Sequence, residues 1–309
     1  MKGRERINLA INHKEADRVP IDLGATRSSS ISTIAYNNLL KTLRLEAEPS
    51  RMYDFIQQLA YPGREIRDRF HVDTIDSGQA FLKNKDEWRE WFLNDGSTCL
   101  IPKYLNIEVD REGKVLLKDR NDVILGQKPK SSLYTDHAYY VYGDLKSIPE
   151  TFVDEDLSKQ MWAIPSPPHH LNITNREDRD LFGRVIKNLY ENTDSAVVTK
   201  IGCVGLESGS FLRKYDKFLL DIYTDRKGAE RLLDRQLDML MVKLEKILSC
   251  IGNHTDILGF ADDLGTQNGL WMSPDVTREV LIPRYKKLWS YVHDHSNCKV
   301  FFHSCGSLI

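Results

Sequence analysis

The chain alternates short apolar runs, most of them ending near a glycine, with longer segments whose apolar residues recur at helical spacing. This alternation is typical of a parallel sheet, because two parallel strands need a crossover of a dozen or more residues between them. Single barrels of roughly 250 residues are common, so a length of 309 residues does not require two domains. We therefore predict one α/β domain over residues 1–309, with a TIM-barrel-like fold. The expected barrel strands begin near Val19, Val72, Val197, Ile257 and Val300.

The helices expected between these strands follow from apolar periodicity and from capping residues. Ser273-Pro274-Asp275 supplies an N-cap, a proline at the first helical position and an acidic first turn. Pro283 should split the helix that follows. The predicted helices cover about residues 3–14, 31–40, 52–70, 176–192 and 225–251, together with the segment after Ser273.

Residues 98–143 interrupt the alternation. Three short runs, 107–110, 114–117 and 122–125, are separated by turn residues, which predicts an inserted antiparallel meander. Residues 163–171 are rich in proline, so we expect an extended connector there. Neither segment predicts a second domain.

Composition restricts the partners of the chain. The formal net charge of -2 gives no field that would attract nucleic acid or an anionic membrane. No stretch approaches the ~20 apolar residues of a spanning helix, and no leader is recognisable, so we expect a cytoplasmic protein. The five cysteines have no paired spacing, which favours reduced thiols over a disulfide framework.

His303 and Cys305 carry the strongest chemical signal. Residues two apart on a strand project to the same side, and imidazole and thiolate are zinc ligands. Both stand at the carboxyl end of the last expected strand, where barrels place reactive groups. The alternative is a buried histidine beside a small apolar cysteine. A third ligand is missing, because Cys298 precedes the strand and His293 and His295 belong to a helix end.

Other polar residues follow the remaining strands at the same predicted rim. Asp262 and Asp263 could orient a substrate, support a metal-binding histidine or cap the next loop. Strand alternation sends these two side chains in opposite directions, which favours Asp262 over Asp263 for the site. The full set comprises Asp262, Asp263 and Glu207 as catalytic candidates and Asp22, Arg27, Asp76 and Gln267 as substrate-binding candidates.

Three segments together resemble the uroporphyrinogen decarboxylase superfamily over essentially the whole chain. They are Arg6 with residues 17–24 (DRVPIDLG), residues 259–267 (GFADDLGTQ) and residues 303–306 (HSCG). The superfamily includes corrinoid-dependent methyltransferases, and the His-x-Cys element resembles the first two zinc ligands of that branch. The resemblance implies a zinc-dependent methyltransferase that moves a methyl group between a partner corrinoid protein and a thiol coenzyme or methylated small substrate. Zinc would act as a Lewis acid at His303 and Cys305, two of three expected ligands.

Two alternatives stay open. Uroporphyrinogen decarboxylases carry an arginine-rich RQAGR segment after the first strand and an FSDI element after the second. Here the matching segments are residues 23–28 (LGATRS) and 74–77 (TIDS), which disfavours porphyrinogen decarboxylation. A non-catalytic member that binds a corrinoid protein or a small ligand is the other alternative.

A closed TIM barrel needs eight strands, and five are expected here. Three more would need on the order of 70–90 residues, so we expect a barrel that is incomplete at the C-terminus. The third zinc ligand of the methyltransferase branch, a later cysteine, would fall in that missing part. A site with two ligands should bind zinc weakly or not at all.

Overall fold

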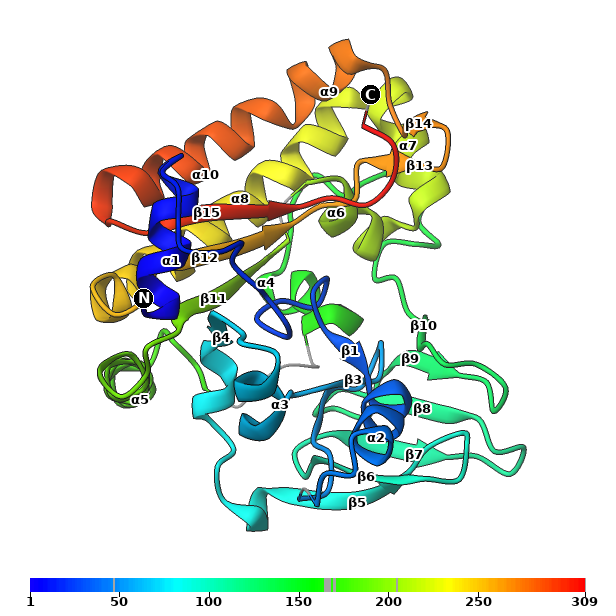
Figure 1. Cartoon of the computed structure of the whole chain (residues 1–309). Helices are drawn as coiled ribbons and strands as arrows, with labels where there is room; N and C mark the ends of the chain where they lie inside the picture. Colours follow the sequence, from blue (N-terminus) through cyan, green and yellow to red (C-terminus); the bar gives the residue numbers. More distant parts are fainter. Residues whose placement is uncertain (47, 164–167, 169–170, 204, 309) are drawn as a thin grey trace.

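The computed structural model describes residues 1–46, 48–163, 168, 171–203 and 205–308. Its central element is a four-stranded parallel sheet with the strand order β15-β12-β11-β4 (Figure 1). Each of these strands therefore lies beside the one that precedes it in the sheet along the chain. Four of the five predicted barrel strands are therefore present, and the fold is mixed α/β. The incomplete TIM-like barrel stays a prediction. The strands are β4 (Thr74–Asp76), β11 (Ala196–Cys203), β12 (Ile257–Ala261) and β15 (Lys299–His303).

The first predicted strand is wrong, because residues 19–24 form no strand. Val19 is 81% exposed, and Pro20 has no backbone N–H to donate. The Ile21 carbonyl accepts one backbone bond from Asp73, but the Ile21 N–H donates to the Asp73 carboxylate at 2.8 Å. A side chain thus takes the place of the backbone partner that a strand would need.

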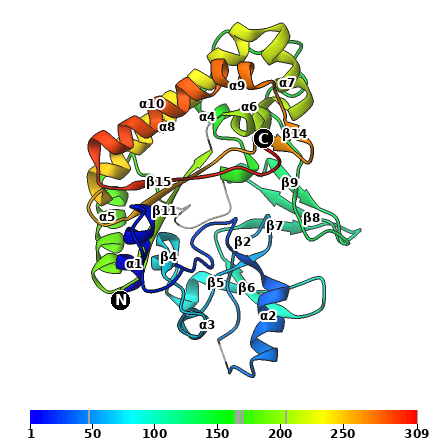
Figure 2. The same cartoon turned by 45° about the horizontal axis from the view of Figure 1, so that its top comes forward.

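Helices cover one face of the parallel sheet, and Figures 1 and 2 show α8 and α10 running along it. The predicted apolar stripe of α8 packs into a large core that includes Leu232 and Leu244. The predicted break at Pro283 is confirmed, with Ser273 Oγ capping α9 by accepting from the Val276 N–H at 3.3 Å. The helices from Arg176 onward are α5 (Arg176–Glu191), α6 (Leu206–Arg213), α7 (Tyr215–Thr224), α8 (Arg226–Ile251), α9 (Pro274–Val280) and α10 (Ile282–His295).

Antiparallel strands occupy the predicted interruption. They form a four-stranded sheet of order β10-β9-β8-β7 and a hairpin of β5 with β6. The hairpin begins ten residues before the expected boundary at 98. Within the proline-rich connector, residues 164–167 and 169–170 lie outside the described residues. The strands are β5 (Trp88–Phe92), β6 (Thr98–Pro102), β7 (Asn106–Val109), β8 (Val115–Lys118), β9 (Ile124–Lys128) and β10 (Asp136–His137).

The helix expected over 52–70 is also wrong. Gln58 has a φ of +54°, and Pro62 cannot continue a helix. Tyr53 and Tyr61 instead stack at 4.1 Å between ring centroids, which suits two paired strands better than one helix. The segment forms β2 (Met52–Asp54) and β3 (Leu59–Ala60), which join β1 (Ile31–Ser32), before α3 (Arg64–Arg69) begins.

The N-terminal helix α1 (Gly3–Ile11) is held against the start of β4. The Arg6 guanidinium donates to Asp17 and to the buried Asp73, each at 2.5 Å. The segment that carries the first part of the family resemblance therefore has a structural role here. Among the described residues no helix combines the length and apolar character needed to cross a bilayer. The remaining elements are α2 (Thr33–Thr42), η1 (Ser77–Ala80), η2 (Lys85–Glu87), α4 (Asp154–Leu157), η3 (Met161–Ala163), β13 (Gly265–Thr266) and β14 (Gly269–Leu270).

Candidate metal centre

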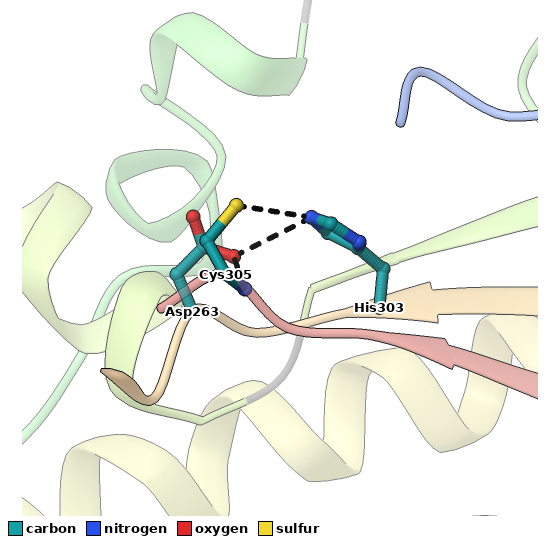
Figure 3. Close-up of side chains that lie close together, drawn as sticks. All are labelled: Asp263, His303 and Cys305. Atoms are coloured by element: carbon teal, nitrogen blue, oxygen red, sulfur yellow. Dashed lines mark hydrogen bonds and ion pairs between the residues drawn. The ribbon is translucent and has the colours of Figure 1, made fainter. Parts of the chain in front are cut away.

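Three potential metal ligands meet beyond the carboxyl ends of two adjacent parallel strands. His303 is the last residue of β15, Cys305 follows it, and Asp263 follows β12 (Figure 3). His303 Nε2 lies 3.2 Å from Cys305 Sγ and 3.7 Å from Asp263 Oδ1. One donor atom from each residue lies within 4.8 Å of the other two. This distance agrees with the prediction that the His303 and Cys305 side chains project to the same side, and their metal-binding role stays a prediction.

Backbone contacts between the two loops bring these side chains together. The register places Ala261 of β12 beside His303 of β15, so both strands end at the same level. The Cys305 N–H then donates to Asp263 Oδ1 at 2.8 Å, and the Gly265 N–H donates to the Cys305 carbonyl at 3.2 Å. Gly306 has a φ of +89°, and a Cβ there would lie 2.3 Å from the Gly265 carbonyl carbon. Only glycine allows this approach.

The structure corrects the expectation that no third ligand is at hand. Cys298 lies before β15 with its thiol 3.5 Å from the Thr255 carbonyl, and the ring of His295 stacks on Tyr291, so neither belongs to the cluster. The third donor is Asp263, the residue that strand alternation disfavoured. The strand β12 ends at Ala261, so alternation no longer governs the direction of the Asp263 side chain.

Asp262 has a different role from the predicted catalytic one. Its carboxylate is fully buried and accepts from the N–H groups of Leu206 at 2.8 Å and Glu207 at 2.7 Å. The Tyr285 hydroxyl donates to the same carboxylate. Gly205 has a φ of +134°, and a Cβ there would lie 2.1 Å from Asp262 Oδ2. Asp262 therefore caps the N-terminus of α6, where two free N–H groups and the helix dipole favour an anion.

Glu207 is held beside the cluster by this cap. Burial, helped by the charges of Asp263 and Asp262, raises the pKa of Glu207 to about 8. Its Oε1 accepts from the Tyr215 hydroxyl at 3.3 Å. Burial also raises the pKa of the Cys305 thiol, with Asp263 and Glu207 adding to the effect. A cation bound beside Glu207 and Cys305 would favour their charged forms and so oppose both shifts.

The structure separates Asp22 from this cluster and places Gln267 in a turn. Asp22 accepts from the Thr74 hydroxyl at 2.6 Å, and Thr74 is paired with Ala196 at the start of β11. Cys203, at the end of β11, is seven residues further along, on the order of 20 Å at the usual rise of a strand. The expected convergence of Asp22 with His303 is therefore wrong. Gln267 lies in the exposed turn between β13 and β14.

Arg27 and Asp76 belong to a second polar cluster. The Arg27 guanidinium donates to the fully buried Asp54, and Lys200 Nζ lies 2.8 Å from Oδ2 of the fully buried Asp76. Lys200 also lies 4.6 Å above the ring of Tyr53. Sequence reasoning missed Lys200 and Asp54. For Lys200 a signal existed, because a lysine inside the otherwise apolar strand β11 needs a buried partner.

The three donors are of the kinds that bind zinc, and two of their three separations suit such an ion. Nitrogen, sulfur and oxygen ligands in a tetrahedral zinc site lie roughly 3.3–3.8 Å apart, given metal–ligand bonds of about 2.0–2.3 Å. Two of the separations in the cluster are 3.2 and 3.7 Å. Three protein ligands leave a fourth position open, as catalytic zinc sites do.

Comparisons with known proteins assign no family. No family profile matches the chain, and neither does any curated protein. One solved structure, a methyltransferase from Methanosarcina mazei, aligns with a TM-score of 0.48 and 13% identity, over 99% of this chain and 70% of that one. A likeness at that level supports no conclusion about activity, so function is argued from the site.

Proposed function

We propose that the chain is a zinc-dependent methyltransferase, moving a methyl group between a corrinoid protein and a thiol coenzyme or a methylated small substrate. The observation that carries the proposal is the convergence of His303, Cys305 and Asp263 beyond two parallel strands, with donor atoms within 4.8 Å of one another. The resemblance of residues 303–306 to the zinc-binding element of the methyltransferase branch supplies the reaction class.

The residues of the chain have separate tasks in this proposal. Zinc in such a site lowers the pKa of a bound thiol, which makes a sulfur nucleophile available at neutral pH. His303, Cys305 and Asp263 hold the ion and leave one position for the substrate. Asp262 holds the start of α6, and with it Glu207, next to Asp263.

Metal analysis of the purified chain tests the first half of the proposal. We expect about one zinc per chain for the wild type, as for a three-ligand catalytic site, and a large loss for H303A, C305S and D263A. His295→Ala and Cys250→Ser are the matched controls, since both residues lie outside the cluster. Zinc should also protect Cys305 from alkylation by iodoacetamide, as measured by peptide mass spectrometry. Equal zinc content in H303A and wild type would contradict the site.

Activity tests the second half. Zinc-loaded protein should accelerate the demethylation of methylcobalamin by 2-mercaptoethanol, followed by the change in cobalamin absorbance, and H303A should not. If the chain binds zinc but does not accelerate this reaction, the proposed metal site is supported and the proposed methyl transfer is contradicted. Metal-free decarboxylation of uroporphyrinogen would instead establish the decarboxylase alternative.

A further inference from the structure

A cavity of about 460 Å³ lies between β11 and the helices α5, α6 and α8. Small-molecule sites typically have volumes of roughly 300–1,000 Å³. Among the described residues, none of the three proposed metal ligands lines this cavity, and neither does Glu207. The cavity is therefore a separate feature of the molecule.

The charged residues of the cavity wall are mostly cations. Arg27, Lys200 and Lys243 line it, against the single carboxylate of Asp76. Lys200 is paired with Asp76, and Arg27 is paired with Asp54 behind the wall. No carboxylate within the described part of the chain pairs with Lys243.

Lys243 is an exposed residue of the cavity wall whose pKa is shifted by the protein around it. Its side chain is accessible to solvent, yet the surrounding protein lowers its pKa. Lys243 therefore lines a cavity that is partly open to solvent. An ammonium group in that position, with no carboxylate partner among the described residues, can pair with an anionic ligand.

The rest of the wall is apolar and aromatic. Phe182 of α5 and Phe211 of α6 are both buried and line the cavity, together with Trp162, Leu157 and Leu240. Aromatic side chains provide large flat surfaces that suit a planar or acyl group. The cavity thus combines one charged group with a mainly apolar lining, which is the usual composition of a site for an amphipathic small molecule.

We propose that this cavity binds a small organic carboxylate, with the carboxylate paired to Lys243 and the apolar body packed against Phe182 and Phe211. The site goes beyond the proposed methyl transfer and does not depend on zinc.

Two probes of the same shape but different charge test the proposal. Naphthalene-2-carboxylate and naphthalene-2-carboxamide are titrated into the full chain by isothermal calorimetry at pH 7, once with zinc and once after EDTA treatment. We expect the carboxylate to bind about ten-fold more tightly than the amide, the ratio for one charge-assisted contact. The ratio should be the same with and without zinc, so loss of the metal site would leave this result intact.

Variants locate the site. Lys243→Met should reduce the preference for the carboxylate below about three-fold, since it removes most of one such contact, and leave the affinity for the amide unchanged. Lys227→Met, at an exposed position near the start of the same helix, should keep the full preference. Leu240→Trp should fill the cavity and weaken both probes. Equal affinity for the two probes, a preference that survives K243M, or no binding of either probe at millimolar concentration would each overturn the proposal.

Discussion

The backbone N–H of Cys305 donates a hydrogen bond to Asp263 Oδ1 at 2.8 Å, which ties the loop after β15 to the loop after β12. These residues are 42 positions apart in the chain. Through this bond the Cys305 backbone fixes the position of the Asp263 carboxylate, so that the carboxylate is oriented toward His303 without a bound ion. A site oriented in advance loses less entropy on binding than one assembled by the metal.

Removal of the Asp263 carboxylate should weaken zinc binding. We expect D263A to lower the affinity for zinc at least about ten-fold, the scale of losing one group that supports a metal site. D263N should fall between D263A and wild type, because an amide oxygen can still accept from Cys305 but is a poorer ligand. Competition with a chromophoric zinc indicator measures both constants. Unchanged affinity in D263A, with the exposed Asp275→Asn as control, would remove Asp263 from the site.

Asp262→Ala should lower the free energy of unfolding. The variant leaves two N–H groups of α6 and the Tyr285 hydroxyl without their acceptor in a buried position. We expect a loss of about 2–4 kcal/mol in the free energy of unfolding, from unsatisfied buried donors and a lost helix cap. Urea denaturation followed by circular dichroism measures it. D263A should cost less than about 1 kcal/mol, as expected for a partly exposed position; equal losses in the two variants would contradict the division of roles.

The ion pair of Lys200 with Asp76 should be strongly coupled. K200M removes the cation that is paired with the fully buried Asp76, which should cost up to about 3–5 kcal/mol of stability, the scale of breaking a buried pair. In the double variant K200M/D76N the buried charge is gone, so part of that loss should return. A double-mutant cycle by urea denaturation should give a coupling of at least about 1 kcal/mol. Additive losses would show that the pair is not an energetic unit.

Protonation of His137 should cost stability in mild acid. Burial lowers the pKa of His137 from its ordinary 6.5 to about 4, and the ring stacks on Phe211 at 4.8 Å between centroids. Below pH 6.5 the unfolded chain takes up a proton that the folded chain resists until about pH 4. The contribution of His137 to stability is therefore fully present above pH 6.5 and is lost as pH falls toward 4, by on the order of 2–3 kcal/mol. The raised pKa of Glu207 acts in the opposite direction between about pH 8 and pH 4.5, so the His137 contribution is read as a difference between variants.

Urea denaturation at several pH values between 4 and 7 checks this dependence. His137→Phe keeps an aromatic ring on Phe211 but cannot be protonated, so the stability of the variant relative to wild type should rise as pH falls across the same window. Parallel curves for H137F and wild type would show that other groups cause the acid sensitivity.

Local patterns in the sequence were enough to predict the helices α5 and α8, the break before α10 and all four strands of the parallel sheet. These features depend on periodicity and on residues such as Pro283, whose effects reach only a few positions along the chain. The same local rules failed at Val19 and over 52–70. There, long-range partners decided the backbone: the Asp73 carboxylate for Ile21, and the stack of Tyr53 on Tyr61.

For the site, the sequence by itself determined that His303 and Cys305 stand at a strand end and can face one another. Only the tertiary structure decided between Asp262 and Asp263, sending the first under α6 and the second to His303. It also separated Asp22 from the cluster and placed Lys200 on Asp76. The physical reason is that the direction of a side chain in a loop depends on which distant backbone groups need an acceptor, and that depends on strand register and helix placement, which residue spacing does not encode.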